Sequence, residues 1–378
     1  MVPIRTLTLG VPEPHPLAAD VVAKGADALR RAEAVFRDAG YEVQTLRLST
    51  RPVFDDMTPT AAYARDLQAA LDDAGLTYCS LGPATSGVET IPDLLIGNDA
   101  LNCTVRLDGN TAAARPAAEA MLRLANETEE GFGNFRFAVL ACVPPGSPFF
   151  PAAYHQGPAN LTVGLQGASI AVAAAKSGLD GLTERSAAAK GGLDGLTERF
   201  AAAVTEEAAP VVRLAERVAA ELGVAFGGID LSPAPNGADS IGAAFEEITG
   251  EFGAPGTLAV AAALTAGIRS TDLPTCGYNG LMLPVMEDVV LARRWEEGRI
   301  GLHDLLAYSS VCGTGLDTVP LPGDSSADAI ARLLLDVTAL AVRLRKPLSA
   351  RLFPVPGTRD GDRTAFTSEY LTDTTVRW

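Results

Sequence analysis

The chain has 378 residues, of which 47% are hydrophobic and 6% aromatic, so it can build a large core from aliphatic side chains. Its formal net charge of −16 argues against nucleic acid and against an anionic membrane surface as partners, because both require clustered Lys and Arg. The five cysteines are scattered without CxxC spacing, and neither a secretory signal nor a membrane-spanning apolar run is visible. These features predict a cytoplasmic protein with reduced thiols.

Strand and helix patterns alternate along the first half of the chain. Alternating apolar and polar residues indicate strands, and apolar residues three and four apart indicate helices. In chain order we expect a strand at 4–10, a helix at 18–39, a strand at 41–49, a helix capped by Thr58, a strand at 76–82, a helix at 111–126 and a strand at 135–143.

The second half continues this alternation. We expect a helix at 193–222 with a kink at Pro210, a strand at 224–232, helices at 240–249, 256–270 and 325–344, and a strand at 348–355. The stretch "VCGTGLDTVPLPGD" (311–324) is neither a good helix nor a good strand, so we interpret it as a loop. Ser325 is the expected cap of the helix that follows.

Alternating strands and helices predict an α/β fold with a mainly parallel sheet, in one domain covering residues 1–378. Because parallel β/α barrels carry their chemistry at the carboxyl ends of strands, the loops after strands are the places to look for a site. A tandem duplication, 173–186 followed by 187–200, matches at twelve of fourteen positions. Fourteen residues make close to four helical turns, so we expect a peripheral extension of a helix or loop.

Thiol chemistry is the first possibility for a site. Cys312 is followed by Gly313 and Gly315, whose backbone N–H groups can approach an anion, while Thr314 adds a hydroxyl. A nearby base or helix N-terminus would activate this thiolate, and Cys276, also followed by glycine, is the second candidate nucleophile. The alternative for either residue is a buried, inert cysteine in a tight turn.

The rare histidines offer acid/base chemistry. His155 lies in the Pro-bounded aromatic loop "PFFPAAYHQG" and is a candidate general acid/base or metal ligand, or else a hydrogen-bonded structural histidine. His15, between two prolines, and His303, in an amphipathic helix, are interpreted as structural or surface residues.

Carboxylates in the Gly/Pro-rich segments can converge. Asp230, Glu287 and Asp288 are candidate ligands of a divalent cation such as Mg²⁺, Ca²⁺, Mn²⁺ or Zn²⁺. The alternative is an acid/base pair, with Asp317 as a catalytic candidate beside the thiol. Each carboxylate can also be a cap or turn residue, and Asp324 before a helix is the clearest example. HExxH, Walker A and strand-linked GxGxxG patterns are absent, so nothing indicates a nucleotide cofactor.

Arg351 lies inside the expected strand 348–355. A buried charge there needs a carboxylate partner or an anionic ligand, because an unpaired charge is costly to bury. Arg351 therefore either forms a structural ion pair or binds a substrate carboxylate, and the second possibility makes it a candidate substrate-binding residue. The other candidate substrate-binding residues are Tyr278, Asn279, Asp230, Gly313 and Thr314.

Several segments together resemble a known family. "IRTLTLG", "PFFPAAYH", "FGGIDLSPAP", "CGYNGLMLPVMED", "VCGTGLDTVPLPGD" and "KPLSARLFPVPGTRDGD" are similar to the signature segments of a bacterial and archaeal family labelled pyruvate-formate-lyase-like, or domain of unknown function 711. The resemblance implies a ten-stranded β/α barrel similar to that of glycyl-radical enzymes, with helices outside and a central loop presenting Cys312 or Cys276. The chain lacks the Arg-Val-x-Gly-aromatic segment near its C-terminus and the adjacent cysteine pair, so we expect no glycyl radical.

The sequence leaves three functions open. The first is an enzyme acting on a small polar or carboxylate-bearing metabolite through a thiol or acid–base site at the barrel mouth. The second is a lyase or hydrolase that depends on a divalent metal. The third is a non-catalytic barrel protein that binds a metabolite or has a regulatory role. Helices rich in Ala, Leu and Val also predict a homo-oligomer.

Overall fold

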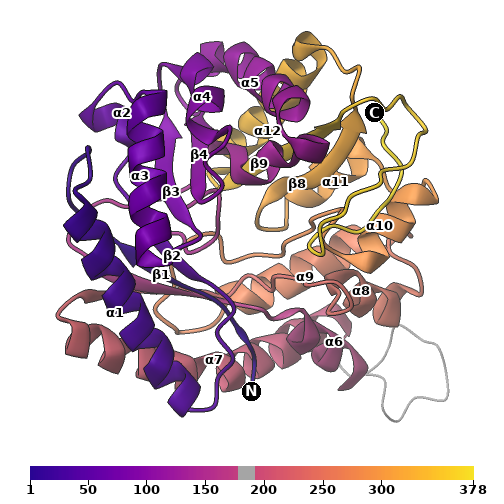
Figure 1. Cartoon of the computed structure of the whole chain (residues 1–378). Helices are drawn as coiled ribbons and strands as arrows, with labels where there is room; N and C mark the ends of the chain where they lie inside the picture. Colours follow the sequence, from indigo (N-terminus) through magenta and orange to yellow (C-terminus); the bar gives the residue numbers. More distant parts are fainter. Residues whose placement is uncertain (178–191) are drawn as a thin grey trace.

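The computed structural model describes residues 1–177 and 192–378, which fold around one curved nine-stranded sheet (Figure 1). The strands lie in the order β7-β6-β1-β2-β3-β4-β5-β9-β8. They are β1 (Ile4–Gly10), β2 (Leu46–Ser49), β3 (Cys79–Ala84), β4 (Leu101–Arg106), β5 (Phe137–Ala141), β6 (Asn160–Leu165), β7 (Ala225–Asp230), β8 (Gly315–Pro322) and β9 (Leu348–Val355).

The sheet is mixed rather than wholly parallel. Strands β1 to β5 pair in parallel with their neighbours, as do β6 with β7 and β8 with β9. The two junctions, β1 with β6 and β5 with β9, are antiparallel. The outer pairs therefore run opposite to the central five strands, so the carboxyl end of β7 lies at the same edge as the amino ends of β1 to β5.

Segment 274–285 contacts both edge strands of the sheet. At one end, Ile229 of β7 and Thr275 form a parallel bridge, and at the other Pro284 bridges Asp317 of β8. The N–H of Val285 donates to the carbonyl of Asp317 over 3.0 Å. Among the described strands β7 and β8 do not pair directly, so strand-to-strand hydrogen bonds do not close the sheet.

Helices surround the sheet, and the core lies between them and the strands (Figure 1). They are α1 (Ala19–Asp38), α2 (Val53–Asp56), α3 (Ala61–Ala74), α4 (Ile91–Leu95), α5 (Ala114–Glu127), α6 (Ala168–Ser177), α7 (Gly192–Leu222), α8 (Ile241–Thr249), α9 (Thr257–Arg269), α10 (Val289–Glu296), α11 (Leu302–Ser309) and α12 (Ala327–Leu344), with 3₁₀ turns at Val88–Thr90, Thr111–Ala113 and Glu129–Arg136. No helix in the described part of the chain is long and apolar enough to cross a membrane.

Local sequence explains most of these boundaries. Thr60 caps α3 by accepting the N–H of Tyr63 over 3.2 Å, and Ser240 caps α8 by accepting from Ala243 over 3.1 Å. Ser326 caps α12 in the same way. The expected caps Thr58, Ser325 and Asp324 are therefore wrong by one or two residues, the usual uncertainty of a helix end.

The α/β prediction is confirmed, but three strands differ from the sequence expectation. Strands β4 and β6 were not expected, and the stretch 311–324 is not a loop, because it contains β8. All eight residues of β8 are buried, although Pro320 and Pro322 suggested a break. Proline is tolerated because β8 is an edge strand, where a missing N–H leaves no ladder partner unsatisfied.

The fourteen-residue duplication spans 173–200 and is only partly described. Helix α6 ends at Ser177 and α7 begins at Gly192. The predicted peripheral extension falls largely on 178–191, outside the described residues.

Candidate functional site

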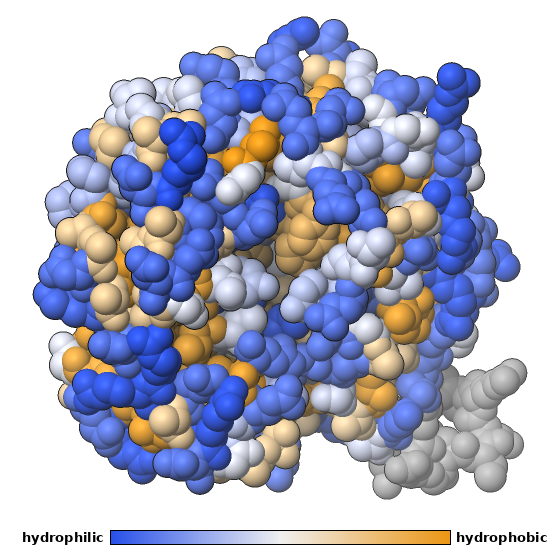
Figure 2. Space-filling view, viewed as in Figure 1, coloured by the Kyte–Doolittle hydropathy of each residue, from blue (hydrophilic) through white to orange (hydrophobic). Residues whose placement is uncertain are grey.

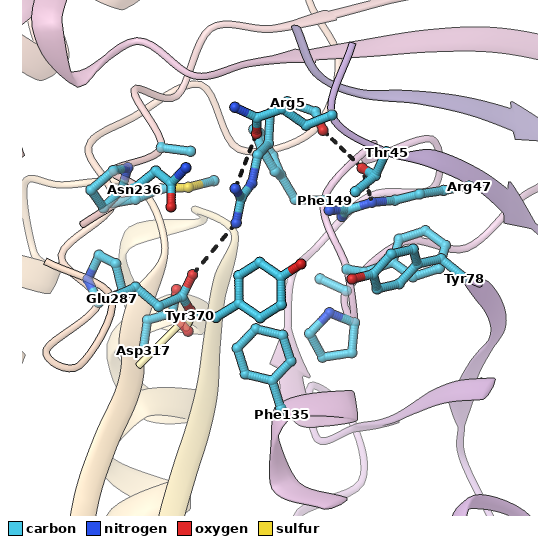
Figure 3. Close-up of a pocket in the computed structure, with 18 of the residues that line it drawn as sticks. Arg5, Thr45, Arg47, Tyr78, Phe135, Phe149, Asn236, Glu287, Asp317 and Tyr370 are labelled. Carbon is cyan, nitrogen blue, oxygen red and sulfur yellow. Dashed lines mark hydrogen bonds and ion pairs between the residues drawn. The ribbon is translucent and has the colours of Figure 1, made fainter. Parts of the chain in front are cut away.

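A cavity of about 530 Å³ lies on the concave side of the sheet. The central strands contribute residues at their amino ends, such as Arg5 of β1, Arg47 of β2 and Asn102 of β4. The opposite wall comes from Asp317 of β8 and Arg351 of β9. Figure 2 shows a hollow near the centre of the face seen in Figure 1, and Figure 3 shows the side chains that line the cavity.

An ion cluster forms the wall of the cavity at β8 and β9. The Nε of Arg351 donates to Oδ1 of Asp317 over 2.7 Å, and a terminal nitrogen of Arg351 donates to Glu287. The guanidinium carbon of Arg351 lies 4.8 Å from the ring centre of Phe135. Burial raises the pKa of Glu287, while Arg351 opposes that shift. Arg351 thus has carboxylate partners, one of the two environments expected for it.

Two further arginines enter the cavity from the amino ends of β1 and β2. A terminal nitrogen of Arg5 lies 3.9 Å from the second oxygen of Glu287 (Figure 3). Arg47 is 6% exposed, and its Nε donates to Oγ1 of Thr45 over 2.9 Å. Among the described residues no carboxylate forms an ion pair with Arg47. Burial, assisted by the charge of Arg5, lowers the pKa of Arg47 to about 9, so it is still cationic at neutral pH.

Neutral polar groups complete the lining. Tyr278 is buried, and burial raises its pKa, so the phenol stays protonated and able to donate. The hydroxyl of Thr314 is buried with no hydrogen-bond partner among the described residues. Ser349 donates to the carbonyl of Thr314 over 2.9 Å. The cavity therefore offers one unused buried hydroxyl beside the ion cluster.

The predicted thiols do not line this cavity. Cys312 is fully buried in the turn before β8, and burial raises the pKa of its thiol, with Lys346 opposing the shift. Cys276 lies at the start of the segment that joins the edge strands, and burial also raises its thiol pKa well above the usual value. Neither environment favours a thiolate.

His155 also lies away from the cavity lining. Its Nε2 pairs with the carbonyl of Gly157 over 2.9 Å, and burial lowers its pKa. The structure therefore does not bring His155, Cys276 and Cys312 together with Asp317 around one cavity.

Two of the predicted metal ligands hold backbone instead. Asp230 accepts hydrogen bonds from the hydroxyl of Ser232 over 2.6 Å and from the N–H of Tyr278 over 2.7 Å. Asp288 caps α10 and accepts the hydroxyl of Ser240 over 2.6 Å. Of the three candidate ligands only Glu287 faces the cavity. Within residues 1–177 and 192–378, no group of three His, Cys, Asp or Glu side chains is arranged to hold a metal ion.

Asn279 and Gly313 organise loops rather than an anion site. Oδ1 of Asn279 accepts the N–H of Leu231 over 3.1 Å, and its Nδ2 donates to the carbonyl of Cys276 over 2.7 Å. The N–H of Gly313 already donates to Leu281 over 2.8 Å, so it is not free to bind an anion. A Cβ on Gly313 would lie 2.5 Å from the backbone of Gly280, so the glycine serves close loop packing.

Sequence reasoning missed Arg5 and Arg47. Each is the second residue of a strand, whereas the sequence analysis expected site residues in the loops that follow the carboxyl ends of strands. Because the outer strand pairs run antiparallel to β1 to β5, carboxyl ends of outer strands and amino ends of central strands lie at the same edge of the sheet. Residues at amino ends therefore also line the cavity. The signal that singled out Arg351, a cation inside an apolar strand, is present in "IRTLTLG" and "LRLS" as well.

Comparison with known proteins gives the family. The family model described as uncharacterised ACR (DUF711) matches residues 1–368. A UPF0210 protein of Pyrobaculum arsenaticum is 33% identical over 88% of this chain and 78% of its own length, and one of Methanopyrus kandleri is 30% identical over 95% and 87%. A UPF0210 protein of Listeria monocytogenes is 27% identical over 96% and 88%. The resemblance predicted from the signature segments is therefore confirmed at the level of the family, and the chain belongs to DUF711.

Proposed function

We propose that the chain is an enzyme that acts on a small polar or carboxylate-bearing metabolite in this cavity by acid–base chemistry. The observation that carries the proposal is the buried cluster of Glu287, Asp317 and Arg351 on the cavity wall. Titratable groups with perturbed pKa values in a concave site are typical of acid–base catalysis.

Glu287 is the proposed general acid/base. Its pKa is raised by burial, which brings the proton affinity of this carboxyl closer to neutral pH. Arg351 touches both Glu287 and Asp317 and so fixes their orientation. Tyr278, protonated and buried, is the proposed hydrogen-bond donor to the reacting group.

The other candidate mechanisms have less support in this geometry. A thiol mechanism would need Cys312 or Cys276 to reach the cavity, which neither lines. A metal-dependent mechanism would need Asp230 or Asp288 beside Glu287, but Asp230 accepts hydrogen bonds from loop backbone and Asp288 from the first turn of α10. A non-catalytic binding protein would use the same cavity without turnover, and the experiment below separates it from an enzyme.

We further propose that the fold is a ten-stranded barrel of the pyruvate-formate-lyase type, with segment 274–285 in the position of the tenth strand. Its bridges to Ile229 and Asp317 support this. The absence of a glycyl radical, the cytoplasmic location and the homo-oligomer stay predictions from the sequence.

A turnover screen tests the proposed enzyme. Purified protein is incubated with a mixture of small carboxylates, hydroxy acids and their amides, and mass spectrometry follows depletion and product formation. We expect conversion by the wild type, loss with Glu287→Gln, and no change with Asp324→Asn, an exposed carboxylate outside the cavity lining. Retained conversion in Glu287→Gln would contradict the assignment, and conversion lost on adding a chelator would favour the metal mechanism.

A further inference from the structure

The charged side chains that lie below the surface of the cavity do not balance. Arg5, Arg47 and Arg351 bring three positive charges there, whereas Glu287 and Asp317 bring two negative ones. The other charged lining residues are exposed to solvent, which screens them: Arg37, Glu42 and Glu369. Arg351 pairs with both carboxylates and Arg5 lies near Glu287, so the unmatched charge belongs to Arg47. This surplus cation occurs in a chain whose formal net charge is −16.

Arg47 is held by contacts that leave its outer edge unused. Its guanidinium carbon lies 5.0 Å and 5.2 Å from the ring centres of Tyr78 and Phe150, and these rings meet edge to face. Nε is bonded to Thr45, but the two terminal nitrogens hydrogen-bond to none of the described residues. The four outer N–H groups of a guanidinium match a carboxylate geometrically.

A buried cation without a partner is costly, so a chain that retains one gains something other than stability from it. Rings of Tyr78 and Phe150 offset part of the cost through cation–π attraction. An anionic ligand would offset the rest of the cost of burying Arg47. Such an unmatched, oriented cation in a cavity is therefore the expected form of an anion subsite.

We propose that Arg47 is the carboxylate subsite of this cavity and that the ligand is a monocarboxylate with a neutral hydrogen-bonding group at its other end. This inference rests on the proposed function, because it takes the cavity as the substrate site. One surplus positive charge is neutralised by one carboxylate. A second carboxylate or a phosphate dianion would place excess negative charge beside Glu287 and Asp317.

The neutral end of the ligand follows from the opposite wall. Thr314 keeps a buried hydroxyl that has no partner in the described part of the chain, and Tyr278 is a protonated phenol. Asp317 and Glu287 accept hydrogen bonds there. A hydroxyl or amide, which both donates and accepts, satisfies this wall better than a second anion.

Probes of equal size but different charge test whether the cavity prefers a monocarboxylate. Succinamide, succinamate and succinate carry zero, one and two negative charges, and the corresponding glutaric series is one methylene longer. Binding is measured by isothermal titration calorimetry and by the shift in unfolding temperature. We expect the monoanion of at least one series to bind, and both its dianion and its diamide to bind at least tenfold more weakly.

Variants of Arg47 separate binding from structure. Arg47→Met should weaken binding of the monoanion about 10- to 100-fold, the effect of losing a charge-assisted bond. Because the substitution also removes an unmatched buried cation, the unfolding temperature without ligand should be unchanged or higher. Arg47→Lys should bind with intermediate affinity, and the exposed Arg343→Met is the control that should leave both quantities unchanged.

Each result decides the proposal. Equal or tighter binding of the dianion, no binding of any monoanion at millimolar concentration, or unchanged affinity in Arg47→Met would overturn it. A lowered unfolding temperature of ligand-free Arg47→Met would make the arginine structural and would also overturn it. Glu287→Gln should still bind the monoanion. Binding of the monoanion by the wild type without any turnover would refute the proposed enzyme but keep the Arg47 subsite. Turnover of a neutral compound alone would keep the enzyme but refute the subsite.

Discussion

Removal of Arg351 should destabilise the fold strongly at neutral pH. Arg351 is 7% exposed and holds Asp317 over 2.7 Å while also contacting Glu287. Its replacement by Met keeps similar bulk but leaves two buried carboxylates whose one remaining ion pair among the described residues is that of Glu287 with Arg5, at 3.9 Å. Removing one partner of a buried ion pair costs about 3–5 kcal/mol, so we expect a loss of that size in the free energy of unfolding.

The loss should depend on pH with a defined sign. Burial raises the pKa of Glu287 and Arg351 opposes this, so the Met variant should raise that pKa further. A carboxyl whose folded pKa is raised binds its proton more tightly in the folded state. Its contribution to stability therefore falls as pH rises from the unfolded pKa of about 4.3 through the folded value. The cost of Arg351→Met should thus be smaller at pH 5 than at pH 8.

Urea unfolding of wild type and variant at pH 5 and pH 8 measures this difference directly. The exposed Arg343→Met is the matched control and should change the free energy of unfolding by less than about 0.5 kcal/mol. A triple variant, Arg351→Met with Glu287→Gln and Asp317→Asn, should recover part of the stability at pH 8. A cost below about 1 kcal/mol at pH 8, or an equal cost at both pH values, would refute the reasoning.

Three further predictions test the loops and the isolated titratable groups. Gly313→Ala places a Cβ 2.5 Å from Gly280 and should lower the free energy of unfolding in urea by about 2 kcal/mol or more. Gly301→Ala is the control, because the atom nearest to its Cβ is 3.9 Å away, and it should cost less than about 1 kcal/mol. Equal costs would exclude tight loop packing as the reason. Cys312 is fully buried with a raised thiol pKa, so iodoacetamide should label it at pH 7.5 only after unfolding, and rapid labelling of the native protein would restore it as a reactive thiol. Burial lowers the pKa of His15 to about 4, so protonation of the unfolded state should cost about 3 kcal/mol of stability as pH falls from 6.5 to 4. That loss should be smaller in His15→Gln than in a His303→Gln control, and identical pH profiles would contradict it.

The amino-acid sequence by itself determined the fold class and most helices. Helical spacing and caps depend on residues close in the chain, which is why α1, α7, α9 and α12 lie close to where the periodicity predicts them. The signature segments determined the family in the same way, because they are local patterns. Arg351 was also recognisable, since a cation inside an apolar strand is costly to bury without a partner or a ligand.

Only the tertiary structure decided which side chains share a cavity. Segment 311–324 looked like a loop because its prolines and glycines discourage regular structure, yet the sheet edge accommodates it as β8. The direction of β6 to β9 relative to β1 to β5 is not written in any local pattern, and it brings Arg5 and Arg47 to face Glu287 and Asp317. Burial decided the chemistry as well, because Cys312 is enclosed in packing and Cys276 lies half-buried outside the cavity lining, whereas Arg47 faces the cavity without an ion-pair partner among the described residues.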